Sequence, residues 1–526
     1  MKLYIPDKTT VFFENQAIEL SDTFDFEGGF IRYELNDALK VSIKSEKQGV
    51  SFIYMRWNFP IEKSLKVLGD AWERGDGDLE WKTVDKDRKM PWYMIVSNGS
   101  DSDFDYTGRC TQCFGVGVLP NAMALWSCDE GGVTLCLDLR CGCVPVQLGD
   151  SILEAATVYF RSYENVSAFS ALKSFCRVMS PAPVLADHIV YGSNNWYYAY
   201  GKTSHQDILE DTRFVVDMCR GLEGTPYMVL DSGWQMHSED VDAPWDRGNE
   251  RFPDMAGLAD EMKRIGVRPG IWVRYLIDGA DGKSRRMNCF PEECYLERNR
   301  CVLDPSHPKV LEYVRETTQR FIDWGYMLIK HDYSTYDIFG FWGFEITEHM
   351  ATGTWSFYDK TKTTAQIIKA FYTVIKESAG DAVITGCNVF SHLCAGIHEF
   401  NRTGDDTSGT EWARTKKMGV NTLAFRIAQD RAFYGADADC VGIFNHNIDW
   451  KYNSQWLKLL SRSGTCLFVS CQPGILNEAE AEDLRQGFRF GSRQSDTLIP
   501  IDWMETRTPS RYLINGEIVT FDWGED

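Results

Sequence analysis

The chain has 526 residues, of which 44% are hydrophobic and 25% are charged. This is the composition of a globular protein, and the length exceeds what one hydrophobic core holds, so we expect a large domain with smaller companions. The formal net charge of −21 repels phosphates, so neither nucleic acid nor an anionic membrane is expected as a partner. We find no secretory signal and no apolar stretch of the roughly 20 residues that span a bilayer, and therefore expect a cytoplasmic protein.

Sixteen cysteines are spread along the chain, which suits reduced thiols in a cytosol. Four of them form a CxxC and a CxC motif, at Cys110 with Cys113 and at Cys141 with Cys143. Such a set could hold a structural zinc ion, but its spacing matches no compact zinc module. We therefore favour small thiols packed inside strands, and we expect no metal and no cofactor.

Residues 1–180 are predicted to form an antiparallel β-sandwich. Short segments rich in β-branched and aromatic residues alternate with Gly, Asn and Asp, which is typical of strands and turns. The clearest strand candidates are FIRYEL (30–35), ALKVSIKS (38–45), VSFIYMRWNF (50–59), GVTLCLDLR (132–140) and ATVYFRSY (156–163). The segment SPAPV at 180–184 indicates a linker, because each proline disfavours helix in the residue before it.

Residues 186–490 are predicted to form a TIM (β/α)8 barrel. Eight strand candidates occur, and nearly all are followed by a helical pattern. A doubly wound sheet is the alternative, but no glycine-rich phosphate loop follows the first strand. Residues 491–526 indicate a small C-terminal β segment. The barrel strands are expected within HIVYGSNNW (188–196), PYMVLDSGW (226–234), RPGIWVR (268–274), YMLIKHDY (326–333), DAVITGCN (381–388), EFNRTGDD (399–406), CVGIF (440–444) and CLFVS (466–470).

The predicted C-terminal ends of these strands, where TIM barrels carry their chemistry, are rich in carboxylates, cations and tryptophan. Aromatic faces stack on sugar CH groups, while Asp, Lys and Arg bind hydroxyls in fixed directions. Each residue alone has a structural explanation as a cap, an ion pair or core, but together they favour a sugar site. Two facing carboxylates are what glycoside hydrolysis requires. The residues are Trp196, Asp231, Trp272, Arg274, Lys330, Asp332, Cys387, Asn388, Arg402, Asp405 and Asp406.

With these residues, the sequence resembles the retaining α-galactosidases of glycoside hydrolase clan D, families 36 and 27. The matching motifs occur in the family's order and span the barrel. The resemblance implies an exo-acting hydrolase that releases a terminal α-linked galactose-type sugar from an oligosaccharide or glycoside. The motifs are NNWYYAYG (194–201), VLDSGWQ (229–235), RGNERFPDMAGLADEMKRIGVRPGIWV (247–273), LIKHDY (328–333), TGCN (385–388), RTGDD (402–406) and DADCVGI (437–443).

The resemblance implies a role for each matched residue. Asp332 would be the nucleophile that forms a covalent glycosyl-enzyme, and Asp406 the acid/base, with its neighbour Asp405 as a competing candidate. Lys330 would bind sugar hydroxyls and help to keep Asp332 ionised, and Arg402 would contact the ring hydroxyls or the nucleophile. The other positions expected to bind substrate are Trp196, Tyr197, Asp231, Ser232, Trp234, Trp272, Arg274 and Cys387.

Two departures from the family pattern leave the sugar undecided. Where the family has two consecutive aspartates after the second strand, this chain has Asp231 followed by Ser232, which alters the contacts to the sugar's 4- and 6-hydroxyls. The glycine-rich run that precedes the acid/base in many relatives is also missing. Galactose, N-acetylgalactosamine, galactosamine and β-L-arabinopyranose all remain candidates.

Other functions compete with hydrolysis. A transglycosylase of the raffinose-synthase type would use the same nucleophile with an acceptor sugar in place of water. A sugar-binding protein whose barrel has lost catalytic activity would need neither a nucleophile nor an acid. A metal-dependent hydrolase would use Asp332, Asp405 and Asp406 with His331 or His398, but these residues lack the spacing of metal ligands. Because successive side chains of a strand point to opposite faces, His331 should also point away from the chemistry. Relatives of this shape often assemble, so a homo-oligomer is a further expectation.

Overall fold

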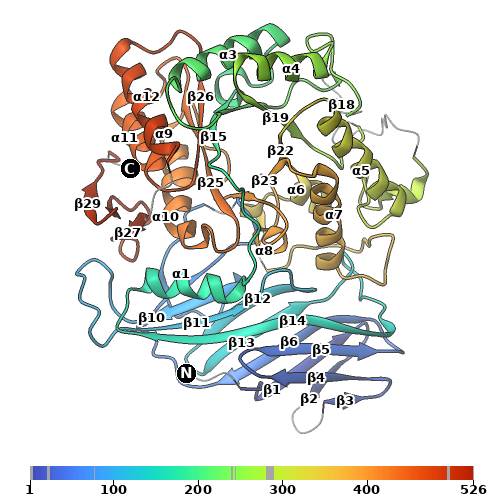
Figure 1. The fold of residues 1–526 in the computed structure, drawn as a ribbon. Helices are drawn as coiled ribbons and strands as arrows, with labels where there is room; N and C mark the ends of the chain where they lie inside the picture. The colour runs from blue at the N-terminus through green and yellow to red at the C-terminus, as the bar shows by residue number, and fades with distance from the viewer. Residues whose placement is uncertain are drawn as a thin grey trace.

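The computed structural model describes residues 4–20, 24–75, 77–238, 241–242, 245–279, 290–346, 348–493 and 498–524. Three units follow one another along the chain (Figure 1): two antiparallel sheets, a closed barrel of parallel strands and a small C-terminal sheet. The predicted fold class is therefore confirmed. Within the described residues, no helix combines the length and the apolar character needed to cross a bilayer.

The N-terminal unit is a sandwich of two sheets. Trp57 of one sheet packs against Phe160 of the other, with ring centroids 5.0 Å apart, and Trp126 lies 6.0 Å from the same ring. The first sheet has the spatial order β2 (Ala17–Leu20), β1 (Lys8–Phe13), β6 (Val50–Asn58), β13 (Gly132–Asp138), β12 (Met123–Asp129) and β9 (Met90–Pro91). The second has the order β3 (Asp25–Phe26), β4 (Gly29–Leu35), β5 (Leu39–Ser45), β14 (Gly149–Glu164), β11 (Cys110–Val116), β10 (Tyr93–Ser97), β7 (Lys66–Gly69) and β8 (Lys82–Thr83).

The central unit is the barrel, and all eight predicted strand segments form strands in it. Each strand pairs in parallel with the next, and the last pairs with the first. Nearly every strand residue is buried, because side chains fill the interior and helices cover the outside. In order the strands are β15 (Tyr191–Asn194), β16 (Tyr227–Leu230), β19 (Arg268–Val273), β22 (Leu328–His331), β23 (Val383–Gly386), β24 (Phe400–Arg402), β25 (Gly435–Ile443) and β26 (Cys466–Cys471).

Helices connect the barrel strands, and their starts are readable in the sequence. Ser204 and Asp207 form a capping box at the first long one, and Thr363 and Gln366 form another further along, each satisfying otherwise unpaired backbone N–H groups. The long helices are α3 (His205–Met218), α4 (Met255–Ile265), α5 (Pro308–Asp323), α7 (Thr364–Ala379), α11 (Trp450–Ser461) and α12 (Glu478–Gly491). Short ones are α2 (Trp196–Ala199), α6 (Ser334–Phe339), α8 (Ser391–Cys394) and the 3-10 turns Glu292–Cys294 and Gly343–Glu345.

The helical segment that follows β24 is interrupted. It begins as α9 (Trp412–Thr415), continues as a π-helical segment (Lys416–Asn421) and then α10 (Thr422–Arg426), and ends in the 3-10 turn Ile427–Gln429. A π-helical segment inside a helix is uncommon and frequently lies at a functional site. Here it lies between Arg414, which lines the pocket at the barrel mouth, and Arg426, which binds Asp70 of the sandwich.

Smaller elements complete the chain. The C-terminal sheet consists of β27 (Leu498–Pro500), β28 (Arg511–Ile514) and β29 (Glu517–Thr520). Two hairpins extend the barrel loops: β17 (His237–Ser238) with β18 (Val241–Asp242), and β20 (Tyr295–Leu296) with β21 (Asn299–Leu303). Helix α1 (Ala168–Met179) lies between the sandwich and the barrel (Figure 1), where it packs on β11 and on the 3-10 turn at 427–429.

A buried polar network joins the sandwich to the barrel. Asp70, just after β7, accepts hydrogen bonds from Arg426 Nε at 3.2 Å and from Gln429 Nε2 at 2.8 Å. Arg426 also donates to the backbone carbonyl of Glu73 at 3.2 Å. Because these groups are buried, the contacts hold the stretch 70–75 of the sandwich firmly against the mouth of the barrel.

The four cysteines of the CxxC and CxC motifs do not gather. Cys110 and Cys113 lie on β11, while Cys141 and Cys143 lie in a turn whose Cys143 backbone N–H donates to the Trp355 carbonyl. In the part of the chain that is described, no three His, Cys, Asp or Glu side chains are placed to share a metal ion. These residues therefore form no zinc site among the described residues.

Candidate active site

A pocket of about 360 Å³ opens at the C-terminal ends of the barrel strands. A smaller cavity of about 150 Å³ lies at the opposite end, among the strand starts Val190, Gly435 and Cys466, where TIM barrels do not carry their chemistry. Nine residues predicted from the sequence line the larger pocket: Trp196, Asp231, Ser232, Trp272, Arg274, Lys330, Asp332, Asp405 and Asp406. Five further residues line it that were not predicted: Arg74, Tyr333, Trp342, Phe344 and Arg414.

Asp332 directly follows β22 and faces the pocket. The Trp272 indole nitrogen donates to its Oδ2 at 3.0 Å, and the Tyr333 backbone N–H donates to its Oδ1 at 2.8 Å. These donors fix the orientation of the carboxylate. Tyr333 has φ of 65°, a left-handed conformation that is rare for a bulky residue, and such backbone strain is concentrated at functional sites.

His331 lies on the other side of the same strand, as the strand period predicts. Its ring is fully buried and packs against Phe371 and His398, with centroids 5.3 and 5.8 Å away. Burial lowers the pKa of His331 to about 3, so its imidazole is neutral. It contributes to the core and does not line the pocket.

Lys330 and Asp231 form an ion pair at the floor of the pocket. Lys330 Nζ lies 2.7 Å from Asp231 Oδ2, and the same oxygen accepts from Asn194 Nδ2 at 2.7 Å. Burial lowers the pKa of Lys330, but Asp231 and other anions outweigh burial and raise the pKa well above its ordinary value. Ser232 Oγ accepts from Gln235 Nε2 at 3.1 Å, so its O–H is available to donate toward the pocket.

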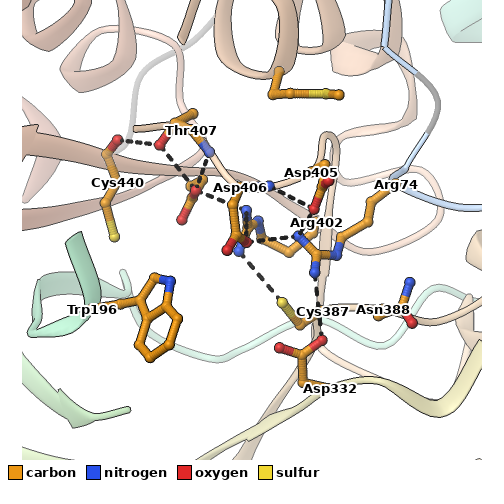
Figure 2. Close-up of polar contacts among 12 residues, drawn as sticks. Arg74, Trp196, Asp332, Cys387, Asn388, Arg402, Asp405, Asp406, Thr407 and Cys440 are labelled. Carbon is orange, nitrogen blue, oxygen red and sulfur yellow. Dashed lines mark hydrogen bonds and ion pairs between the residues drawn. The ribbon is translucent and has the colours of Figure 1, made fainter. Parts of the chain in front are cut away.

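Asp405 and Asp406 follow β24 and have different surroundings. Asp405 is 13% exposed, and arginines bind both of its oxygens: Arg74 Nη1 at 2.7 Å and Arg414 Nη2 at 3.1 Å. Asp406 is 31% exposed, and its Oδ1 lies 2.8 Å from Arg74 Nη1 and 3.4 Å from Arg402 Nη2. Figure 2 shows both carboxylates beside the Arg74 guanidinium. Asp406 is therefore the more accessible of the two.

The charges around Asp406 control its protonation. Burial raises the pKa of this carboxyl, but the guanidinium groups of Arg74 and Arg402 and the ammonium group of Lys330 outweigh burial. The pKa of Asp406 is therefore held well below its usual range. Without a bound ligand, Asp406 is a carboxylate at neutral pH.

Three predicted substrate-binding residues lie beneath the pocket and do not line it. Arg402 is 1% exposed at its side chain and pairs with Asp439 at 2.8 Å. The Tyr197 hydroxyl donates to the same carboxylate, and the Cys387 thiol lies 3.4 Å from Arg402 Nη1 (Figure 2). The side chains of Arg402, Tyr197 and Cys387 thus bind buried neighbours, and they support the pocket floor from below.

Trp234 also requires a correction. It is fully buried, and its indole nitrogen donates to the Trp272 backbone carbonyl at 2.9 Å. Its ring packs edge-on against Phe321 and Trp324, with centroids 5.7 and 6.1 Å away. Trp234 is therefore a core residue that positions Trp272, which in turn donates to Asp332.

The unpredicted lining residues come from the sandwich and from segments that follow the barrel strands. Arg74 belongs to the sandwich, outside every barrel motif, so no barrel-strand pattern indicated it. Trp342 and Phe344 follow α6 in the aromatic run FGFWGF (339–344). This run is a visible sequence signal, but it lies outside the strand ends from which the site was predicted. Trp342 stacks on Tyr336 with centroids 4.5 Å apart, and Phe344 is 60% exposed, so this segment forms an aromatic rim.

The fold and the site together define a barrel with an N-terminal sandwich and several carboxylates at the barrel mouth. No family model matches the chain, and no curated protein matches its sequence. Solved structures do match. The chain shares the fold of α-galactosidases, several of which are assigned to glycoside hydrolase family 36, so the architecture implied by the sequence resemblance is confirmed.

Three of these structures illustrate the likeness. TtGalA, the α-galactosidase of Thermus thermophilus, solved with p-nitrophenyl α-D-galactopyranoside, has a TM-score of 0.62 at 15% identity, covering 94% of this chain and 99% of that one. A variant of AgaA from Geobacillus stearothermophilus, solved with 1-deoxygalactonojirimycin, has a TM-score of 0.58 at 15% identity over 88% and 67%. The galactosidase domain of the α-galactosidase-sucrose kinase AgaSK has a TM-score of 0.52 at 15% identity over 88% and 66%.

Proposed function

We propose that this protein is a retaining exo-glycoside hydrolase that releases a terminal α-linked galactose-type sugar. The observation that carries the proposal is the placement of Asp332 and Asp406 around one guanidinium group at the barrel mouth, 3.6 Å and 2.8 Å from Arg74 nitrogens. Two carboxyls that flank a pocket of sugar size are the equipment for double displacement. The fold shared with α-galactosidases supports the same function.

In the proposed mechanism, Asp332 attacks the anomeric carbon and the glycosidic bond breaks. Asp406 gives its proton to the departing oxygen, and a covalent glycosyl-enzyme on Asp332 results. Asp406, now a carboxylate, removes a proton from water as the water oxygen attacks the same carbon. The sugar leaves with its anomeric configuration retained, and Asp406 is protonated again.

The floor of the pocket would bind the sugar hydroxyls. Lys330 donates and Asp231 accepts, while Trp196 and Trp272 offer ring surfaces for the apolar face of the sugar. Ser232 carries no charge and replaces an acceptor with a group that also donates. We therefore keep galactose, N-acetylgalactosamine, galactosamine and β-L-arabinopyranose as candidates for this subsite.

The first experiment is a screen of nitrophenyl α- and β-glycosides of these sugars. We expect turnover of one α-galactose-type substrate, or of the β-L-arabinopyranoside. Asp332→Asn should lower kcat by at least about 10³-fold, because the nucleophile is lost. Asp323→Asn, an exposed aspartate on α5, is the matched control and should keep full activity.

The screen also separates the alternatives. Full activity of Asp332→Asn would contradict the nucleophile assignment, whereas binding without turnover would favour a sugar-binding protein. Transfer to an added acceptor sugar, seen by product analysis, would favour a transglycosylase. Loss of activity on chelation would favour a metal-dependent hydrolase.

We also propose a cytoplasmic location, because all fifteen cysteines in the described residues are free thiols.

A further inference from the structure

A residue of the sandwich reaches the centre of the proposed active site. Arg74 is 4% exposed at its side chain, and its guanidinium nitrogens lie 2.7 Å from Asp405, 2.8 Å from Asp406 and 3.6 Å from Asp332. Figure 2 shows this group between the carboxylates that follow β24 and the one that follows β22. One side chain thus contacts both proposed catalytic groups.

The backbone that delivers Arg74 is anchored to the barrel just before this residue. Upstream, Asp70 binds Arg426 and Gln429 of the barrel. Next to it, Glu73 accepts from Asn388 Nδ2 at 2.5 Å and from the Gly75 backbone N–H at 2.9 Å. These contacts fix the backbone next to Arg74, so the fold itself places its guanidinium at the barrel mouth.

We propose that Arg74 is a positioning residue that holds the acid/base Asp406 as a carboxylate. It thereby favours the second half of the reaction, hydrolysis of the glycosyl-enzyme, over the first half, its formation. This inference rests on the proposed function. A carboxylate at Asp406 is the form that the second half needs, because there it removes a proton from water. The first half needs the protonated form when the leaving oxygen is a poor leaving group.

Arg74 is not the only charge that faces Asp406. Arg402 reaches the same oxygen from β24, and Lys330 approaches from β22. Other titratable groups lie near Asp406: the Asp405 carboxylate beside it opposes these cations, and the phenols of Tyr197 on α2 and Tyr333 after β22 are neutral because their pKa is raised. Among the cations, Arg74 has the shortest distance to the Asp406 carboxylate, so its removal should change the protonation of Asp406 most.

The consequence is a selective pH dependence. For an unactivated α-galactoside, kcat/KM requires protonated Asp406, so it should fall as pH rises through the lowered pKa. For a nitrophenyl glycoside the leaving group departs without a proton, so the same limb should be weak or missing. Hydrolysis of the glycosyl-enzyme needs the carboxylate and should stay efficient at acidic pH.

The test compares Arg74→Gln and Arg74→Lys with the wild-type protein, using kcat/KM against pH for an unactivated disaccharide and a nitrophenyl glycoside. Removing an adjacent opposite charge shifts a carboxyl pKa by about 1–3 units. For Arg74→Gln, the basic limb on the disaccharide should therefore move to higher pH by at least about one unit. Arg74→Lys keeps the charge and should keep the limb near that of the wild type.

Arg88→Gln is the matched control. Arg88 is another arginine of the sandwich, but it donates to the backbone carbonyls of Val67 and Glu80 and does not line the pocket. Its variant should leave the pH profile unchanged. The inference would be overturned if the basic limb of kcat/KM on the disaccharide stayed at the same pH in Arg74→Gln. It would also be overturned if this limb lay above about pH 6 in the wild-type protein.

The two proposals fail in different ways. If the wild-type protein shows no activity that Asp332→Asn abolishes, the proposed function is wrong and the inference falls with it. If that activity exists and the limb does not respond to Arg74, the inference alone is wrong. If Arg74→Gln does not fold, the wild-type limb and the Arg74→Lys profile still decide the question.

Discussion

Asp405 and Asp406 are adjacent in the sequence, yet their side chains have different surroundings. Asp405 is bound on both oxygens by arginines, and its Oδ1 also accepts a hydrogen bond from the Asp406 backbone N–H. Asp406 is more exposed and lines the pocket, and its ion pairs with Arg74 and Arg402 both use Oδ1. This difference makes Asp406 the better candidate for contact with a leaving group, and Asp405 the better candidate for a structural role.

We predict that Asp406→Ala lowers kcat/KM on an unactivated galactoside by about 10³-fold, because general acid catalysis contributes about 10²–10⁴-fold. On a nitrophenyl glycoside the same variant should lose less than about 10-fold in glycosylation, since that leaving group needs no proton. Parallel kinetics on the two substrates provide the measurement. If Asp405→Ala shows the leaving-group dependence instead, the acid/base is Asp405.

A second prediction concerns Glu73, which is 1% exposed. Burial raises the pKa of Glu73 to about 7, with Asp405 adding to the rise and Arg74 opposing it. The folded protein thus binds this proton more tightly than the unfolded chain does. The contribution of Glu73 to stability is full below pH 4.5 and falls as pH rises to about 7.

Glu73→Gln mimics the protonated group and does not titrate. The free energy of unfolding of this variant, relative to the wild type, should therefore shift in its favour by up to about 3 kcal/mol between pH 4.5 and 7. Urea unfolding at pH 5 and pH 8 measures the shift. Glu130→Gln, at an exposed site, is the control, and an equal change in both variants would contradict the prediction.

Among the elements, the segment after α6 shapes the pocket rim. Its Trp342 is braced by Tyr336, and its Phe344 is 60% exposed at the pocket mouth. An exposed ring beside a sugar pocket offers a stacking surface for the group attached to the sugar. We therefore place the leaving group of the substrate over this segment.

Phe344→Ala should lower kcat/KM on a galactose-containing trisaccharide by about 2–10-fold, which corresponds to the roughly 0.5–1.5 kcal/mol of an aromatic contact. The fluoride leaving group of galactosyl fluoride has no ring to stack on Phe344, so turnover of this substrate should be unaffected. Phe490→Ala removes another exposed ring, on α12, and serves as control. Equal losses on both substrates would show that Phe344 acts on the sugar subsite instead.

Most of the barrel strands were predictable because they are short apolar runs followed by a helical pattern, which is a local signal. The π-helical interruption at 416–421 was not predictable in the same way, because the residues around it follow an ordinary helical pattern. Trp234 shows the same limit at one position. A tryptophan beside a strand end matches a binding motif and a core residue equally well, and packing against Phe321 and Trp324 decided for the core.

At the scale of the whole molecule, the sandwich and the barrel act as one structure through the network of Asp70. Asp70 and Arg426 are both buried, and Gln429 completes the contact. Asp70→Ala should lower the free energy of unfolding by about 3–5 kcal/mol, because it removes the carboxylate that balances the charge of a buried guanidinium. Denaturant unfolding measures the loss.

Asp25→Ala is the control for this prediction. Asp25 pairs with Arg32 at 2.7 Å, but both side chains are at least half exposed, and exposed pairs contribute about 0–1 kcal/mol. A similar loss in both variants would show that the interface network carries no special stability.

Local sequence patterns were enough to predict the order of the units, the eight strands and most of the strand-end residues, because periodicity, turns and motifs are properties of neighbouring residues. Which of those residues share the pocket depends on tertiary packing. That packing also brought in Arg74, which is 332 positions from Asp406 in the chain. No local pattern encodes that approach, since it arises where the sandwich packs on the barrel and buries the guanidinium among the carboxylates.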